Sequence, residues 1–90
     1  MTLAVKQLQL GRLLTSVYDF PEVGDELPLH DHDETNVHIT IVQRGRFEIF
    51  GPGWVIEADA FNNSVLDWQP RQPHGFRALE KNSRIINIVK

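Results

Sequence analysis

The sequence contains no cysteine, so it can form neither a disulfide nor a thiolate–metal bond. No apolar run approaches the roughly 20 residues that a membrane-spanning helix needs. The start of the chain also lacks the basic segment followed by an apolar one that marks a secretory signal peptide. These absences predict a cytoplasmic protein with no membrane partner.

An excess of positive charge is missing as well. Lys and Arg number 9 against 12 Asp and Glu, giving a formal net charge of -3. Nucleic acids and anionic membranes are bound by basic surfaces, so we predict no nucleic-acid partner. Many acidic residues lie between Leu13 and Gln43, where there is no Lys or Arg. They form either a solvated loop or a negative rim that attracts cations.

Helical periodicity is absent, and short runs rich in β-formers alternate with Gly- and Pro-containing turns. This pattern predicts an all-β protein, a small sandwich or barrel of short antiparallel strands. Ninety residues suffice for one domain with a single modest core. Within it, residues 1–12 would be an arm or edge strand and 24–90 the barrel core. The expected strands are 2–10, 13–20, 37–43, 46–50, 54–57, 65–68, 76–79 and 84–89.

All four histidines fall in two short segments. His30, His32 and His38 lie close together in the chain, and His74 follows Pro73. Side chains two residues apart on a strand share a face, so His30 and His32 can converge on one point. Imidazole is a good ligand for transition metals. The cluster predicts a site for one divalent metal ion (Fe, Mn, Ni, Zn or Cu), the alternative being ordinary loop or hydrogen-bonded histidines.

The spacing of the first segment resembles the first motif of the cupin superfamily. That motif runs Gly, five residues, His-x-His, three or four residues, Glu, six residues, Gly. Here Gly24 is followed after five residues by His30 and His32, after five more by His38, and after a further six by Gly45. His38 therefore stands where the family usually has Glu, after one extra residue. The resemblance then implies a four-histidine site, which some small cupins also have.

The second motif of that family is a Pro/Gly-rich turn ending in histidine, and residues 70–74 are similar to it. Arg71 stands where Gly is common, and Ala78 where the motif often ends in Asn. The resemblance covers residues 24–90. It implies a small jelly-roll barrel in which the two motifs lie on facing strands.

A ligand pocket is expected beside the histidines. Thr40 follows His38 on the same face of its strand, and Phe76 follows His74 in the same way; with Trp68 they are the predicted pocket-lining residues. Four neutral imidazoles leave the charge of an ion uncompensated, which favours a small anionic ligand. No Asp or Glu is clearly placed to act in catalysis, so we assign no catalytic residue.

Three functions are compatible with such a site. The first is a metal-dependent oxygenase acting on a small organic acid or diketone. The second is a non-enzymatic cupin that binds a small ligand or serves in an assembly, with a structural metal. The third is a metal-dependent isomerase or lyase, which would need a nearby acid or base.

The strand that begins near His38 is apolar on both faces. A sheet with one wet face alternates apolar and polar residues, whereas Val37, Ile39 and Ile41 make the second face of this strand apolar too. That face needs a cover, either the N-terminal arm or a second copy of the chain. We predict a homodimer, because small barrels commonly gain stability by association.

Overall fold

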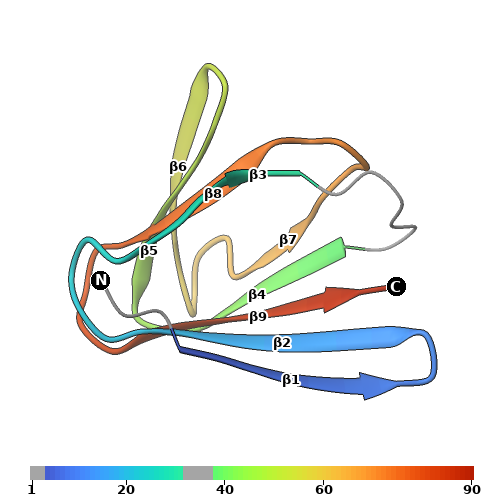
Figure 1. The fold of residues 1–90 in the computed structure, drawn as a ribbon. Helices are drawn as coiled ribbons and strands as arrows, with labels where there is room; N and C mark the ends of the chain where they lie inside the picture. Colours follow the sequence, from blue (N-terminus) through green and yellow to red (C-terminus); the bar gives the residue numbers. More distant parts are fainter. Residues whose placement is uncertain (1–3, 32–37) are drawn as a thin grey trace.

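The computed structural model describes residues 4–31 and 38–90, which form nine strands and no helix (Figure 1). The prediction of an all-β protein is therefore confirmed. Strand bounds agree with the expected ones to within two residues wherever a strand was predicted. The strands are β1 (Ala4–Leu10), β2 (Leu13–Phe20), β3 (Glu26–His30), β4 (His38–Arg44), β5 (Arg46–Gly51), β6 (Trp54–Asp59), β7 (Val65–Asp67), β8 (His74–Ala78) and β9 (Ser83–Val89).

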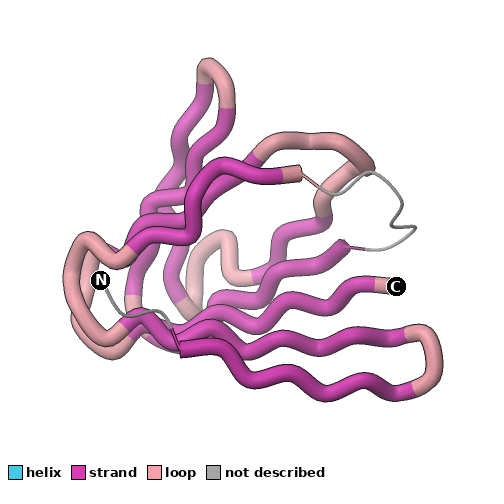
Figure 2. The backbone as a smooth tube through the Cα atoms, viewed as in Figure 1, coloured by secondary structure: helices cyan, strands magenta, loops and turns pink. Residues whose placement is uncertain are grey.

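Two antiparallel sheets face each other in a jelly-roll arrangement (Figures 1 and 2). The first sheet has five strands in the order β1-β2-β9-β4-β7, and the second has four in the order β3-β8-β5-β6. Residues 4–10 form the edge strand of the larger sheet, paired with β2, instead of an arm folded over a sheet face. Within the described residues, no helix has the length and apolar character that a membrane crossing requires.

Strand β3 is not among the strands expected from the sequence, in which the composition of residues 21–26 indicates a loop. Pro28 lies within it and cannot donate to a sheet, which argues against a strand in the sequence. In the structure β3 pairs with β8, and the pairing is irregular between Leu27 and His30, where the proline is accommodated. Strand β8 also begins at His74, two residues earlier than expected, so this histidine lies on a strand and not in the preceding loop.

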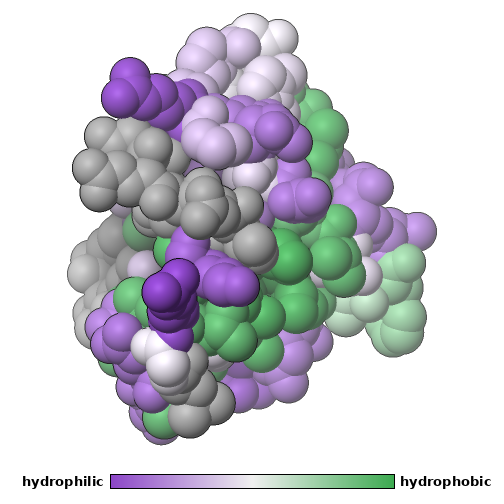
Figure 3. Space-filling view, turned by 90° about the vertical axis from the view of Figure 1, so that its right-hand side faces the viewer, coloured by the Kyte–Doolittle hydropathy of each residue, from purple (hydrophilic) through white to green (hydrophobic). Residues whose placement is uncertain are grey.

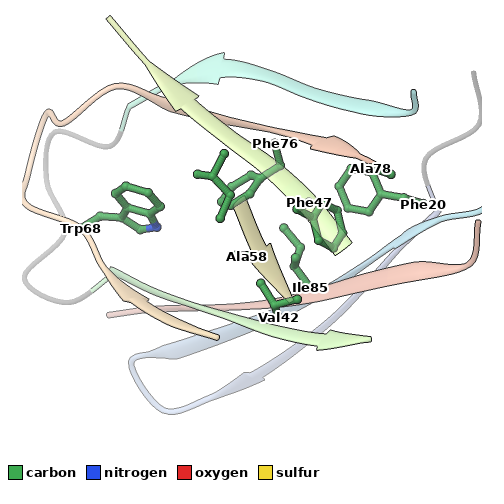
Figure 4. Close-up of a cluster of buried hydrophobic side chains, with 9 residues drawn as sticks. Phe20, Val42, Phe47, Ala58, Trp68, Phe76, Ala78 and Ile85 are labelled. Atoms are coloured by element: carbon green, nitrogen blue, oxygen red, sulfur yellow. The ribbon is translucent and has the colours of Figure 1, made fainter. Parts of the chain in front are cut away.

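Inward-facing side chains of both sheets form the core. The ring of Phe47 packs edge-on against Phe20, with centroids 4.9 Å apart, and against Phe76 at 6.4 Å. In Figure 4 these aromatic rings occupy one part of the cluster, and Trp68 lies at the opposite end from Phe20. The core residues are Phe20, Val42, Phe47, Ile49, Ala58, Trp68, Phe76, Ala78 and Ile85.

The outer faces of the two sheets differ sharply. On the four-stranded sheet, Arg77 forms ion pairs with Glu26 at 3.2 Å and with Glu48 at 3.0 Å. On the five-stranded sheet the central strands carry aliphatic side chains that register with one another and remain partly exposed. They are Val17, Ile39, Ile41, Ile86 and Ile88. The larger sheet thus has an apolar outer face that no described residue of the chain covers.

The turn between β4 and β5 depends on Gly45, which has a φ of 81°. A Cβ there would collide with the side chain of Ser83 and lie 2.8 Å from its Cα. Gly53 has a similar φ of 79° but nothing within 4 Å of the equivalent position. Both Gly→Ala changes impose left-handed strain, about 1–2 kcal/mol. Only Gly45→Ala adds overpacking, about 1–3 kcal/mol.

We therefore expect Gly45→Ala to lower the free energy of unfolding by clearly more than Gly53→Ala does. Urea unfolding of the two variants beside the wild type measures this difference. Equal losses would contradict the close packing of the β4–β5 turn against Ser83.

Candidate metal centre

Three of the four histidines come together at one end of the barrel. His30 ends β3 and is the direct strand partner of His74, the first residue of β8, with ring centroids 4.6 Å apart. His38 opens β4 in the opposite sheet, and its ring centroid is 5.0 Å from that of His74. His38 thus reaches the cluster from the sheet that faces His30 and His74. His32 lies outside the described residues.

Backbone carbonyl groups determine which ring nitrogen carries the hydrogen in two of these histidines. The Nδ1 atom of His30 lies 2.8 Å from the Pro28 carbonyl oxygen, and Nδ1 of His74 lies 2.8 Å from that of Gln72. A carbonyl oxygen only accepts, so each Nδ1 must carry the hydrogen and donate. In the neutral ring the lone pair is then on Nε2. Metal-binding histidines are held by this kind of bond, which sets both the tautomer and the ring orientation.

The turn before β8 places the carbonyl group that holds His74. Gln69 and Gln72 close this turn on each other: Gln72 N donates to the Gln69 carbonyl at 3.1 Å, and Gln69 N donates to the Gln72 side chain at 3.0 Å. Between them Arg71 has a φ of 60°. Glycine adopts that conformation without strain, which explains why the cupin motif commonly has Gly there.

The indole of Trp68 stacks on the imidazole of His74, with centroids 4.0 Å apart and planes inclined by 5°. Two hydrogen bonds hold Trp68 in place. Its Nε1 donates to Thr40 Oγ1 at 2.9 Å, and its backbone N donates to the His38 carbonyl at 2.9 Å. The ring plane of His74 is therefore set by a neighbour that cannot easily rotate.

Thr40, Phe76 and Trp68 were predicted to line a pocket. All three are buried, Thr40 and Phe76 completely and Trp68 to 7% exposure. The rings of Trp68 and Phe76 lie beside His74, with centroids 4.0 Å and 5.8 Å from its own. The described residues enclose no pocket of their own. The lining role of these residues stays a prediction.

The chemistry of the donors fits a metal bound by imidazole. The three described rings are neighbours, and the Nε2 atoms of His38 and His74 are buried inside the barrel. Among residues 4–31 and 38–90, however, no three ligand-type side chains are already arranged to hold an ion. A complete ligand set thus requires either His32 or adjustment of the described rings.

Asp19 and Asp25 are held by hydrogen bonds away from the histidines. Asp19 accepts hydrogen bonds from Arg84 at 2.6 and 3.2 Å, and these bonds lower the pKa of its carboxyl group. Asp25 is buried just before β3, where it accepts a hydrogen bond from Glu22 N at 3.0 Å. At about 3.3 Å per residue, it lies roughly 17 Å along the strand from His30. Neither carboxylate can act as an acid or base at the candidate site.

A row of polar side chains crosses the inner face of the larger sheet; Thr40 was predicted to lie at the site, whereas Asn87 and Ser16 were missed in the sequence. Thr40 pairs directly with Asn87 across β4 and β9, and Asn87 pairs with Ser16 across β9 and β2. Thr40 is fully buried, and the other two are each 4% exposed. The available signal was Asn87 itself, one polar residue inside the aliphatic run of β9.

Solved structures with the same fold are numerous. KdgF from Halomonas sp. is 22% identical, with a TM-score of 0.83 over 97% of this chain and 78% of that one. An RmlC-like cupin protein from Desulfovibrio desulfuricans is 26% identical, with a TM-score of 0.80 over 97% and 81%. A protein with a double-stranded β-helix domain from Klebsiella pneumoniae is 20% identical, with a TM-score of 0.82 over 97% and 70%.

The chain therefore has the double-stranded β-helix fold of the cupins, as the resemblance of its two motifs implied. The sequence itself matches no protein-family model and no curated protein.

Proposed function

We propose that this small cupin binds one divalent metal ion through His30, His32, His38 and His74, and that the ion binds a small organic anion. The observation that carries the proposal is the pair of Nδ1–carbonyl bonds at His30 and His74. These bonds give two adjacent histidines the tautomer that a ligand to a metal needs, in rings 4.6 Å apart.

A bound ion would supply Lewis acidity toward an anionic oxygen, and a redox-active ion would extend this to oxygenase chemistry. The chain's own contribution is positional. The Gln72 carbonyl and the Trp68 indole hold His74 in place, and the burial of His38 and His74 excludes water from that side. Four neutral ligands would leave the ion's charge for the anion to compensate.

Among the candidate reactions we propose oxygenation of a small organic acid or diketone. An isomerase or lyase would need a protein acid or base beside the ligand, and the described residues place no buried carboxylate next to the histidines. Oxygenation does not strictly require one. A non-enzymatic role with a structural metal is the alternative, and it predicts a coordination sphere closed by protein ligands.

Tryptophan fluorescence tests metal binding directly. Because the indole of Trp68 lies 4.0 Å from His74, Cu²⁺ bound by this histidine should quench its emission strongly. Trp54→Phe leaves Trp68 as the single reporter. We expect saturable quenching at one equivalent of Cu²⁺ in this variant, and its loss when His74→Ala is added. Quenching that is unsaturable, or unchanged by His74→Ala, would contradict the proposal.

A further inference from the structure

The donors and acceptors inside the larger sheet can be oriented without ambiguity. Trp68 Nε1 can only donate, so Thr40 Oγ1 accepts that hydrogen bond at 2.9 Å. The hydroxyl hydrogen of Thr40 is then donated to Asn87, whose facing atom lies 2.6 Å away. That atom must be the oxygen Oδ1, because an amide nitrogen would bring a second hydrogen to the same contact.

The fixed oxygen determines where the amide hydrogens of Asn87 go. With Oδ1 committed to Thr40, both N–H groups of Nδ2 point away from β4, and no group in the described ranges accepts from them. Ser16 lies directly opposite Asn87 on β2. Its Oγ accepts a hydrogen bond from Gln7 Nε2 at 3.1 Å, so its hydroxyl hydrogen is available for donation. Asn87 and Ser16 thus place two groups with donor hydrogens side by side on the inner face of the sheet.

Asn87 and Ser16 are both 96% buried, being 4% exposed. Their side-chain polar atoms are nevertheless not among the fully buried atoms of the described residues that lack a hydrogen-bond partner, so the Asn87 amide nitrogen keeps a small opening to solvent. A bound molecule can take the place of water at that opening and accept from the amide.

The donors lie beside the candidate metal centre. His38 and Thr40 are two residues apart on the same face of β4, and Asn87 is the direct partner of Thr40. Diagonal neighbours of this kind are about 7–8 Å apart between Cα atoms. A short molecule can therefore contact an ion at His38 with one end and Asn87 with the other. Figure 3 views the molecule from the end where β4 begins and β9 finishes, and shows apolar surface bordered by hydrophilic surface there.

We propose that Asn87, with Ser16 opposite it, binds the carboxylate or enolate oxygen of a small organic anion whose other end contacts the metal. This inference rests on the proposed function, and it adds the residues that select the ligand. The ion attracts the negative charge of the ligand, whereas hydrogen bonds from the amide and the hydroxyl group orient the bound ligand. Thr40 and Trp68 act as positioning residues, since they fix the orientation of the Asn87 amide.

Two anions separate the contributions of the metal and of Asn87. Azide is a small ligand for the ion alone, whereas pyruvate has a carboxylate and a ketone oxygen that can span the two groups. Both are titrated into Cu²⁺-loaded protein and followed by visible absorption. Asn87→Leu has nearly the same shape and removes both amide donors. Ser16→Ala removes the facing hydroxyl and leaves the contacts among Trp68, Thr40 and Asn87 in place.

We expect Asn87→Leu to weaken pyruvate binding about tenfold or more, since a hydrogen bond to a charged group contributes at least that much. Azide affinity should stay within about twofold of the wild type. Ser16→Ala should weaken pyruvate binding by a smaller factor, and it keeps the test decisive if Asn87→Leu does not fold. Wild-type pyruvate affinity in the folded variants would overturn the inference while leaving the metal site intact. Failure of the wild type to retain Cu²⁺ would overturn the proposed function instead, and the inference with it.

Discussion

Removing the metal from the loaded protein should lower its melting temperature by roughly 10–20 °C. A ligand that binds only the folded state stabilises it by about 2.7 kcal/mol at a hundredfold excess over Kd. In a domain of this size each kcal/mol shifts the melting temperature by about 4–8 °C. The measurement is a thermal scan by circular dichroism, with and without EDTA, on protein whose metal content has been determined by elemental analysis.

His74→Ala should abolish the response to EDTA, because His74 is central to the cluster and contacts both His30 and His38. A matched control is Asn62→Ala, on the exposed β6–β7 turn. It should keep the full shift even if its melting temperature falls slightly. An identical melting curve before and after EDTA, in protein shown to be loaded, would refute metal binding to the folded state.

The second large effect concerns association. We expect the wild-type protein to be a homodimer in solution and Ile39→Glu to be a monomer. The outer face of the five-stranded sheet has aliphatic residues in register, Ile39 with Ile88 and Ile41 with Ile86. β1 pairs at the sheet edge and does not cover them. A second copy related by a two-fold axis would bury this face against itself.

Light scattering coupled to size-exclusion chromatography measures the mass directly. Val55→Glu is the matched control, because Val55 is an exposed aliphatic residue, at 58% exposure, on the other sheet. It should leave the dimer unchanged, whereas Ile39→Glu would place a charge in the interface. A monodisperse wild-type monomer would refute the dimer, and the apolar face would then be simply exposed to solvent.

Local patterns predicted the fold well, because they depend on short-range chemistry. β-branched runs bounded by Gly and Pro located most strands, including Leu13–Phe20 without error. The exception was β3, where Pro28 argued against a strand that is nevertheless stabilised by pairing with β8. Tertiary pairing overrode the local signal at that point.

The sequence predicted which histidines form the candidate site better than it predicted how they are arranged. Spacing indicated that His30, His38 and His74 would meet, and they do. It could not place His38 in the opposite sheet, because sheet order depends on contacts between distant parts of the chain. Asn87 and Ser16 were missed for the same reason. Each is an ordinary polar residue in its own strand, and only the pairing of β2 with β9 sets them opposite each other.

The interior has an aromatic part around Phe20 and Phe47, and Trp68, which stacks on His74, lies at the other end of the buried cluster (Figure 4). The aromatic part needs no ion to pack, so the protein stripped of metal should keep its fold and accept a different ion afterwards. The metal found in any one preparation then depends on which metal ions the growth medium contains as much as on the relative affinities of the site for them. Identifying the native cofactor consequently requires competition between ions under defined free concentrations, with reloading shown to be reversible.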